Sequence, residues 1–203
     1  TEIVKPHLQN AKFEDGGFGF DYRMAMNIPD FWIKIIKEQK DENWKPSSIF
    51  WEVKNRRIDE KTISYCESHD QALVGDKTII FRLIDADMYW HFKKGDENDM
   101  AFRGIALHKM IRLVTASTIN GGYLNFMGNE FGHPEWIDFP REGNGWSYKY
   151  ARRQWNLVDN KELDYHYLAD FDREMLKVIK SERNFNRTPV QEIWHNDGDQ
   201  VLA

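Results

Sequence analysis

The sequence contains one cysteine, Cys66, in 203 residues, so no disulfide can form within the chain. A single cysteine is typical of proteins from a reducing compartment. No apolar run approaches the ~20 residues that a membrane-spanning helix needs. The first ten residues, TEIVKPHLQN, have no hydrophobic region of the kind found in secretion signals. We therefore expect a soluble, intracellular protein with no membrane partner.

The sequence also has no strongly basic segment, with 28 basic and 33 acidic residues and a net charge of −5. Nucleic-acid binding proteins usually concentrate Lys and Arg on one segment or face, so no nucleic-acid partner is expected. Two arginine pairs, at 56–57 and 152–153, are isolated. We interpret them as solvated charges at helix or strand ends.

Two hydrolase motifs are missing as well. There is no HExxH, and the four candidate metal ligands match no familiar zinc spacing; they are His69, Asp70, His133 and Glu135. The sequence therefore predicts neither a metal nor another cofactor. GxSxG is also absent, which counts against Ser68 as a nucleophile.

Short apolar segments alternate with helical patterns along the chain. The predicted strands are 16–23, 62–66 and 122–127, and the predicted helices are 29–39, 76–89 with Asp76 as its cap, 103–118, 148–155 and 167–179. This alternation is typical of parallel β/α units and predicts an α/β fold. Three strands are fewer than the eight of a closed barrel, and a doubly wound sheet is the alternative. In either fold, chemistry occurs where strands end.

Polar clusters follow two of these strands. Residues 67–71 read ESHDQ, and residues 128–136 read GNEFGHPEW. A turn needs Gly, Asn or Ser, whereas glycosidic chemistry needs a nucleophile or base, an acid, and charge that balances a positively charged transition state, and carboxyl groups can supply these. Each residue has a structural alternative: Glu67 as the ion-pair partner of an arginine, His69 as a buried hydrogen-bonded side chain, and Glu130 as a group that orients a neighbour. Together they favour an active site. The aromatic fraction of 14% fits either a core of large rings or rings that stack on sugars.

The run YCESHDQALVGDKT at 65–78 closely resembles the fourth signature region of the 1,4-α-glucan branching enzymes of the α-amylase superfamily, and the eukaryotic type matches best. Further similar stretches lie in order along the chain, at 19–33, 55–78, 103–115, 122–144, 147–157 and 171–175. The resemblance implies about strands six to eight of a (β/α)₈ barrel at 1–184. It implies the start of a C-terminal β-sandwich at 185–203, so that both ends look cut.

Residue roles also follow from the resemblance. Asp70 matches the carboxylate that stabilises the transition state, and His69 matches a substrate contact beside it. Further candidate substrate contacts are Glu67, Asn129, Glu130 and Trp136. The family's nucleophile and acid/base residues precede the matched region, and Glu2 aligns too poorly to be the acid.

The resemblance therefore implies that the parent enzyme cleaves α-1,4 glucans and forms α-1,6 branches, and that this chain alone is inactive. The expected partner is an α-glucan such as glycogen, amylose or amylopectin. The expected location is the cytoplasm, with a plastid as the alternative. Two other functions stay open: a hydrolase of the α-amylase type and a non-catalytic α-glucan-binding protein.

Overall fold

The computed structural model describes residues 10–57, 60–73, 76–181 and 189–203. The chain divides into two compact units. The first comprises Thr1–Tyr65, Val114–Leu124 and Glu182–Ala203, and the second comprises Cys66–Leu113 and Asn125–Ser181. The predicted domain boundary between residues 184 and 185 lies outside the described residues, as does Glu2.

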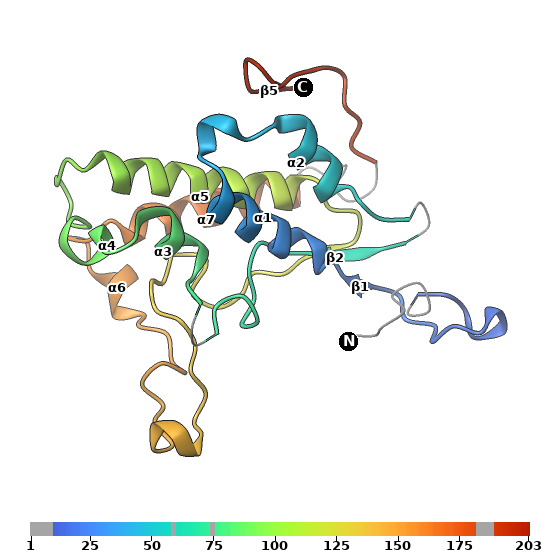
Figure 1. Cartoon of the computed structure of the whole chain (residues 1–203). Coiled ribbons are helices and arrows are strands. Elements are labelled where there is room, and N and C mark those ends of the chain that lie inside the picture. The colour runs from blue at the N-terminus through green and yellow to red at the C-terminus, as the bar shows by residue number, and fades with distance from the viewer. Residues whose placement is uncertain (1–9, 58–59, 74–75, 182–188) are drawn as a thin grey trace. The chain divides into compact units, whose positions relative to one another are not determined.

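A three-stranded parallel sheet lies in the first unit (Figure 1). Its strands are β1 (Arg23–Met24), β2 (Thr62–Ser64) and β3 (Gly122–Tyr123), with β2 in the middle. Arg23 pairs with Thr62, and Ser64 pairs with Tyr123. Because the strands are parallel and in register, β2 and β3 end at the same edge of the sheet. The expected parallel α/β arrangement is confirmed.

The strand predicted at 16–23 is wrong, apart from its last residue. Gly16 and Gly19 have positive φ values of 77° and 67°, and Gly19 N donates to Ala11 O in a local turn that follows η2 (Phe13–Asp15). The alternating rings at Phe18 and Phe20 are 47% and 50% exposed. Aromatic residues at every second position therefore belong here to a turn with left-handed glycines, not to a buried strand.

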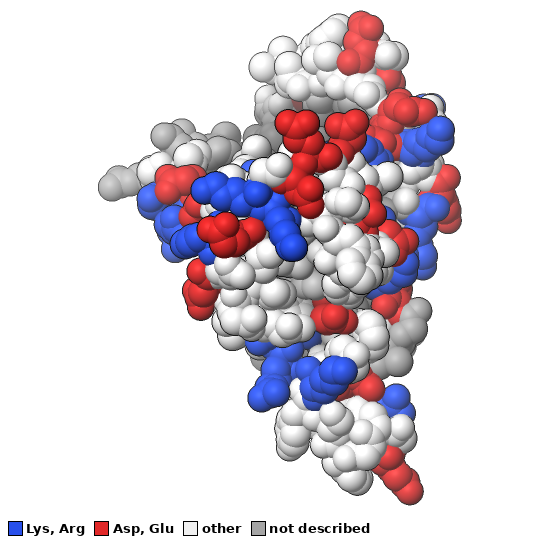
Figure 2. Space-filling model, turned by 90° about the vertical axis from the view of Figure 1, so that its left-hand side faces the viewer, with Lys and Arg blue, Asp and Glu red and all other residues white. Residues whose placement is uncertain are grey.

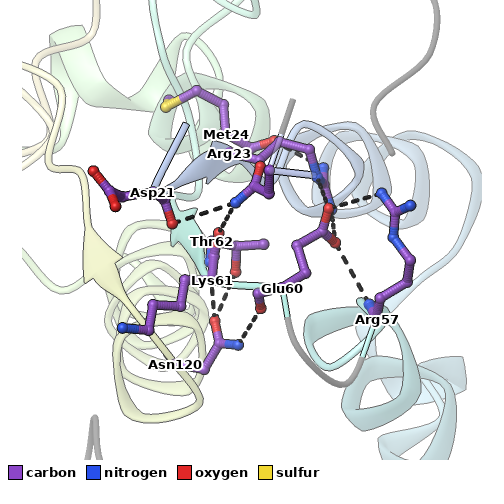
Figure 3. A network of polar contacts seen from close by, with 9 residues as sticks. Asp21, Arg23, Met24, Arg57, Glu60, Lys61, Thr62 and Asn120 are labelled. Carbon is purple, nitrogen blue, oxygen red and sulfur yellow. Dashed lines mark hydrogen bonds and ion pairs between the residues drawn. The ribbon is translucent and has the colours of Figure 1, made fainter. Parts of the chain in front are cut away.

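Polar side chains hold the amino-terminal ends of the strands together (Figure 3). The buried Glu60 accepts hydrogen bonds from Arg23 Nε and Nη2, both at 2.8 Å, and from Arg57 Nη2 at 3.0 Å. These arginines lower the pKa of Glu60 to about 2. Asn120, just before β3, donates to Glu60 O and accepts from Thr62 N, which ties β3 to β2.

Two helices of the first unit pack on each other, α1 (Asn27–Glu38) and α2 (Pro46–Val53), separated by η3 (Asp41–Asn43). The helix predicted at 29–39 is confirmed by α1, on which Ile28, Trp32 and Ile35 recur at helical spacing and are buried. Trp32 Nε1 donates to Thr115 Oγ1 at 2.9 Å. The antiparallel strands β4 (His195–Asn196) and β5 (Val201–Leu202) contact α2.

The second unit contains two short helices in place of one predicted helix, α3 (Ile79–Ile84) and α4 (Asp87–Trp90). Asp85 ends α3 with a positive φ of 60°. The cap is Thr78, whose Oγ1 accepts from Phe81 N, and the predicted cap Asp76 instead pairs with Arg82. Because a residue with positive φ cannot continue a right-handed helix, the backbone at Asp85 separates the two pieces.

Two long helices are confirmed, α5 (Asp99–Ser117) and α7 (Tyr165–Ser181), and the buried Arg112 and Asp172 form an ion pair between them within the second unit. The helix predicted at 148–155 is wrong. That stretch consists of turns between η4 (Glu142–Asn144) and the short α6 (Asn156–Asp159). Within the described residues, none of the helices has the length and apolarity needed to cross a membrane.

Candidate functional site

The loop that follows β2 is locked by its own side chains. Gln71 Oε1 accepts from Ser68 N and from Ser68 Oγ, both at 2.9 Å, and Ser68 Oγ accepts from Asp70 N at 3.2 Å. Ser68 and Gln71 are buried, whereas the side chains of His69 and Asp70 are 51% and 41% exposed. His69 Nε2 lies 3.0 Å from Asp70 Oδ1. The Ser68–Gln71 hydrogen bonds thus leave a histidine–carboxylate pair exposed to solvent. The structural alternative of a buried His69 is therefore wrong.

The second polar segment lies beside this loop in the same unit. The His69 ring is 6.3 Å from the Phe126 ring and 6.2 Å from the Phe139 ring, measured between centroids. Ile137 N donates to Ala72 O, and Thr78 Oγ1 donates to Pro134 O at 3.1 Å. The structure therefore brings together the two clusters that follow the second and third strands.

Glu67 lies in the interior, where only 2% of the residue is exposed. Its Oε2 accepts a hydrogen bond from Ile79 N, the first residue of α3. Burial raises the pKa of Glu67 to about 7, against the opposing effects of the Ile79 N–H and of three arginines, Arg153, Arg82 and Arg112. A side chain so enclosed cannot reach a ligand in this conformation. Its position favours the structural alternative over the predicted substrate contact, although its partner is a helix end and not an arginine.

Asn129 and Glu130 are half-buried in the turn after Phe126. Glu130 Oε2 accepts from Gly128 N at 2.8 Å, and Asn129 N donates to Phe126 O at 3.0 Å. Gly128 has a φ of 99°, so the turn needs a residue without Cβ there. Glu130 therefore orients its neighbour Gly128, which is the structural alternative considered for this residue. Contact of the Asn129 or Glu130 side chain with substrate stays a prediction.

Trp136 is half-buried and stacks on Tyr150. The ring centroids are 4.4 Å apart and the planes differ by 23°. One face of the indole is therefore covered by protein. Its role as a substrate contact stays a prediction and would involve the other face or the edge of the indole.

Arg153 is a buried structural residue that the sequence did not indicate. It is 8% exposed, and its guanidinium donates to the carbonyl oxygens of Glu135, Trp136 and Tyr150 and to His133 Nδ1, the last at 2.8 Å. The interpretation of 152–153 as solvated charges is wrong for this residue. Nothing in the sequence separates it from Arg152, which is exposed.

His133 is held by the same network. Its Nδ1 accepts from Arg153 and from Glu135 N, so the neutral ring bears its hydrogen on Nε2. Burial and the nearby arginine lower the pKa of His133 to about 4. A neutral, buried imidazole fixes the course of the 133–136 segment and is not available as an acid near neutral pH.

Possible metal ligands do not assemble in the described part of the chain, where no group of three or more His, Cys, Asp or Glu side chains could hold an ion. Glu135 instead accepts from Tyr89 Oη at 3.2 Å, and burial together with that carboxylate raises the pKa of Tyr89 to about 12. The site is thus a surface of one histidine–carboxylate pair bordered by aromatic rings, supported by buried Glu67 and Arg153.

These features define the class of protein: an α/β chain with a parallel sheet and a histidine–carboxylate pair on the loop after its middle strand. No protein-family model matches the sequence. Proteins named 1,4-alpha-glucan-branching enzyme do match: 60% identity over 80% of this chain in Rhizophagus irregularis, 54% over 93% in Saccharomyces cerevisiae and 58% over 83% in Felis catus. Over the matched region the chain is similar to the 1,4-alpha-glucan-branching enzymes. It spans about a quarter of the length of these relatives, from 24% to 27%.

Proposed function

We propose that this chain is part of a 1,4-α-glucan branching enzyme and that it contributes Asp70 and His69 to the active site. The observation that supports this most directly is the exposed His69–Asp70 pair, locked by Ser68 and Gln71 within a segment similar to the branching enzymes. The parallel sheet agrees with about strands six to eight of a (β/α)₈ barrel, with the strand-following loops at the active face.

The proposed reaction is a transglycosylation. The enzyme cleaves an α-1,4 bond with a covalent glucosyl intermediate, and a 6-hydroxyl of a glucan chain then attacks to form an α-1,6 branch. Positive charge develops on the sugar in the transition state, and a carboxylate in the position of Asp70 stabilises it. His69 Nε2 lies 3.0 Å from Asp70 Oδ1, and the half-exposed ring is placed to bond sugar hydroxyls once substrate displaces that contact. The nucleophile and the acid/base are proposed to come from residues outside this sequence.

The proposed substrate is an α-glucan, either glycogen or a starch polymer. We also propose a cytoplasmic location, with a plastid as the alternative. A single, buried cysteine is consistent with a reducing compartment.

The test is a chimaera in which this chain replaces the matched segment of the Saccharomyces cerevisiae relative. We expect the chimaera to convert amylose into a branched product, measured as α-1,6 linkages, and Asp70→Asn to lower its turnover by about three orders of magnitude or more. Asp70→Asn keeps the size and the Ser68 contact through its backbone, so a loss reports the charge. The 203-residue chain alone should show no turnover.

Two outcomes would contradict the proposal. One is branching by the isolated chain, and the other is a chimaera whose activity is unchanged by Asp70→Asn. Release of reducing ends without new α-1,6 linkages would instead identify a hydrolase of the α-amylase type.

A further inference from the structure

An exposed aromatic segment follows the candidate site in the second unit. Residues 138–150, called the aromatic loop below, are closed at the base by a hydrogen bond from Asp138 N to Tyr150 O at 3.4 Å. Phe139, Trp146 and Tyr148 in this loop are 51%, 66% and 66% exposed. In Figure 1 the loop is the orange segment that projects away from the helices of its unit, and in Figure 2 the lower end of the view is mainly uncharged surface. Rings exposed to this extent on one short segment indicate a binding surface.

The loop is ordered by its own hydrogen bonds. Asn144 Oδ1 accepts from Arg141 N at 3.0 Å and from Ser147 N at 3.2 Å, and Asn144 Nδ2 donates to Phe139 O at 3.0 Å. Trp146 N donates to Arg141 O at 3.0 Å. A loop that is already ordered loses little conformational entropy when a ligand binds.

The backbone at Trp146 is strained. Its φ is 58°, directly after Gly145 at 62°. A bulky residue rarely adopts this left-handed conformation, and such residues are found where the surroundings impose them, often at ligand sites. Here the strained residue also exposes its indole, so burial of the ring in this unit does not account for its position.

The aromatic loop is continuous with the His69–Asp70 pair. The Phe139 ring lies 6.2 Å from the His69 ring in an edge-on arrangement, and the Trp136–Tyr150 stack forms the base of the loop. Exposed charged side chains, Arg141 and Lys149, are interspersed among the rings. Flat rings beside hydrogen-bonding groups complement a sugar, which has an apolar C–H face and a rim of hydroxyls, better than they complement an apolar protein surface.

We propose that the aromatic loop is a second α-glucan contact, on which Trp146 and Tyr148 stack against sugar rings of a chain that extends beyond the His69–Asp70 pair. This inference rests on the proposed function, because it takes the same polymer as its ligand. The contact adds affinity for long chains without taking part in bond cleavage.

The first test is electrophoresis of the 203-residue chain in gels that contain glycogen. We expect glycogen to retard the chain, and Trp146→Ala with Tyr148→Ala to weaken binding by about fivefold or more. The matched control is Trp51→Ala, which removes an indole of similar exposure, 64%, from α2 in the other unit. It should bind as the unchanged chain does. Trp146→Phe with Tyr148→Phe retains flat rings and should restore most of the affinity, and circular dichroism checks folding of each variant.

The second test uses the chimaera, in which Trp146→Ala should raise KM for amylose by several-fold with kcat nearly unchanged. The inference is overturned if the unchanged chain is not retarded, or if Trp51→Ala weakens binding equally. It is also overturned if Trp146→Ala lowers the thermal stability of the chimaera without changing KM, since the loop would then pack on protein. Glycogen binding by a chimaera that forms no branches would refute the proposed function alone, and branching with unchanged KM would refute this inference alone.

Discussion

Glu67 provides a prediction that depends chiefly on its burial. Its ordinary pKa of 4.5 is raised to about 7 in the folded chain, chiefly because burial penalises the charged carboxylate. The folded chain therefore binds this proton more tightly than the unfolded chain. The stability that this proton contributes is complete below pH 4.5 and is lost as the pH rises through 7. A difference of that size corresponds to about 3 kcal/mol of unfolding free energy, of which ~2–3 kcal/mol falls between pH 5 and pH 8.

Glu67→Gln tests this value. The amide oxygen can still accept from Ile79 N, and the side chain stays neutral at every pH. Relative to the unchanged chain, we expect the variant to gain ~2–3 kcal/mol of unfolding free energy between pH 5 and pH 8. The measurement is urea unfolding of both chains across that range, followed by circular dichroism. Glu174→Gln, at a carboxylate that is 63% exposed on α7, is the control and should show no such trend.

Parallel stability curves for Glu67→Gln and the unchanged chain would refute the reasoning. They would mean that Glu67 has the same proton affinity in the folded and unfolded chain. The arginines near it would then offset the cost of burial in full.

Two further predictions concern charges that the fold buries. Glu60→Gln should lower the free energy of unfolding by up to about 3 kcal/mol at pH 7. The pKa of Glu60 is about 2 in the folded chain, so its contribution to stability is complete above pH 4.5 and is lost as the pH falls through 2. Unfolding free energies measured at decreasing pH should therefore converge for the two chains. Arg153→Lys should cost about 2 kcal/mol or more, since one ammonium cannot reach four acceptors, and Arg152→Lys should stay within about 0.5 kcal/mol; equal effects in thermal unfolding would contradict the network.

Helices whose apolar residues recur at helical spacing could be predicted from the sequence. In α1, apolar residues at helical spacing are the ones that the fold buries, and α7 lies within two residues of its predicted ends. The failures occur where the backbone leaves the regular regions. Left-handed glycines convert 16–23 into a turn, and the positive φ at Asp85 divides one predicted helix into α3 and α4. Such local backbone changes depend on tertiary contacts that a hydrophobic pattern does not encode.

The candidate site was predicted in part. Polar residues after strands indicated a site formed by 67–71 and 128–136, because parallel strands end at one edge. In the structure His69 contacts Phe126 and Phe139, the residues that flank the second of these segments. Burial could not be predicted in the same way. Arg153 becomes a buried donor only because carbonyl oxygens from 135, 136 and 150 converge on it. The sequence around these residues does not indicate that their carbonyl oxygens point to one arginine.

Glu67 and Asp70 illustrate how one short loop gives two carboxylates different tasks. Only two residues lie between them, yet Glu67 is 2% exposed and bonded to the start of α3, whereas the Asp70 side chain is 41% exposed. The Ser68–Gln71 bonds turn the chain between them. The buried carboxylate fixes the loop to the helix, and the exposed one remains accessible to a ligand. A substitution at Glu67 should therefore act on the proposed reaction through the position of Asp70, and its effect should be recovered by glutamine, which keeps the bond to Ile79, but not by alanine, which removes it.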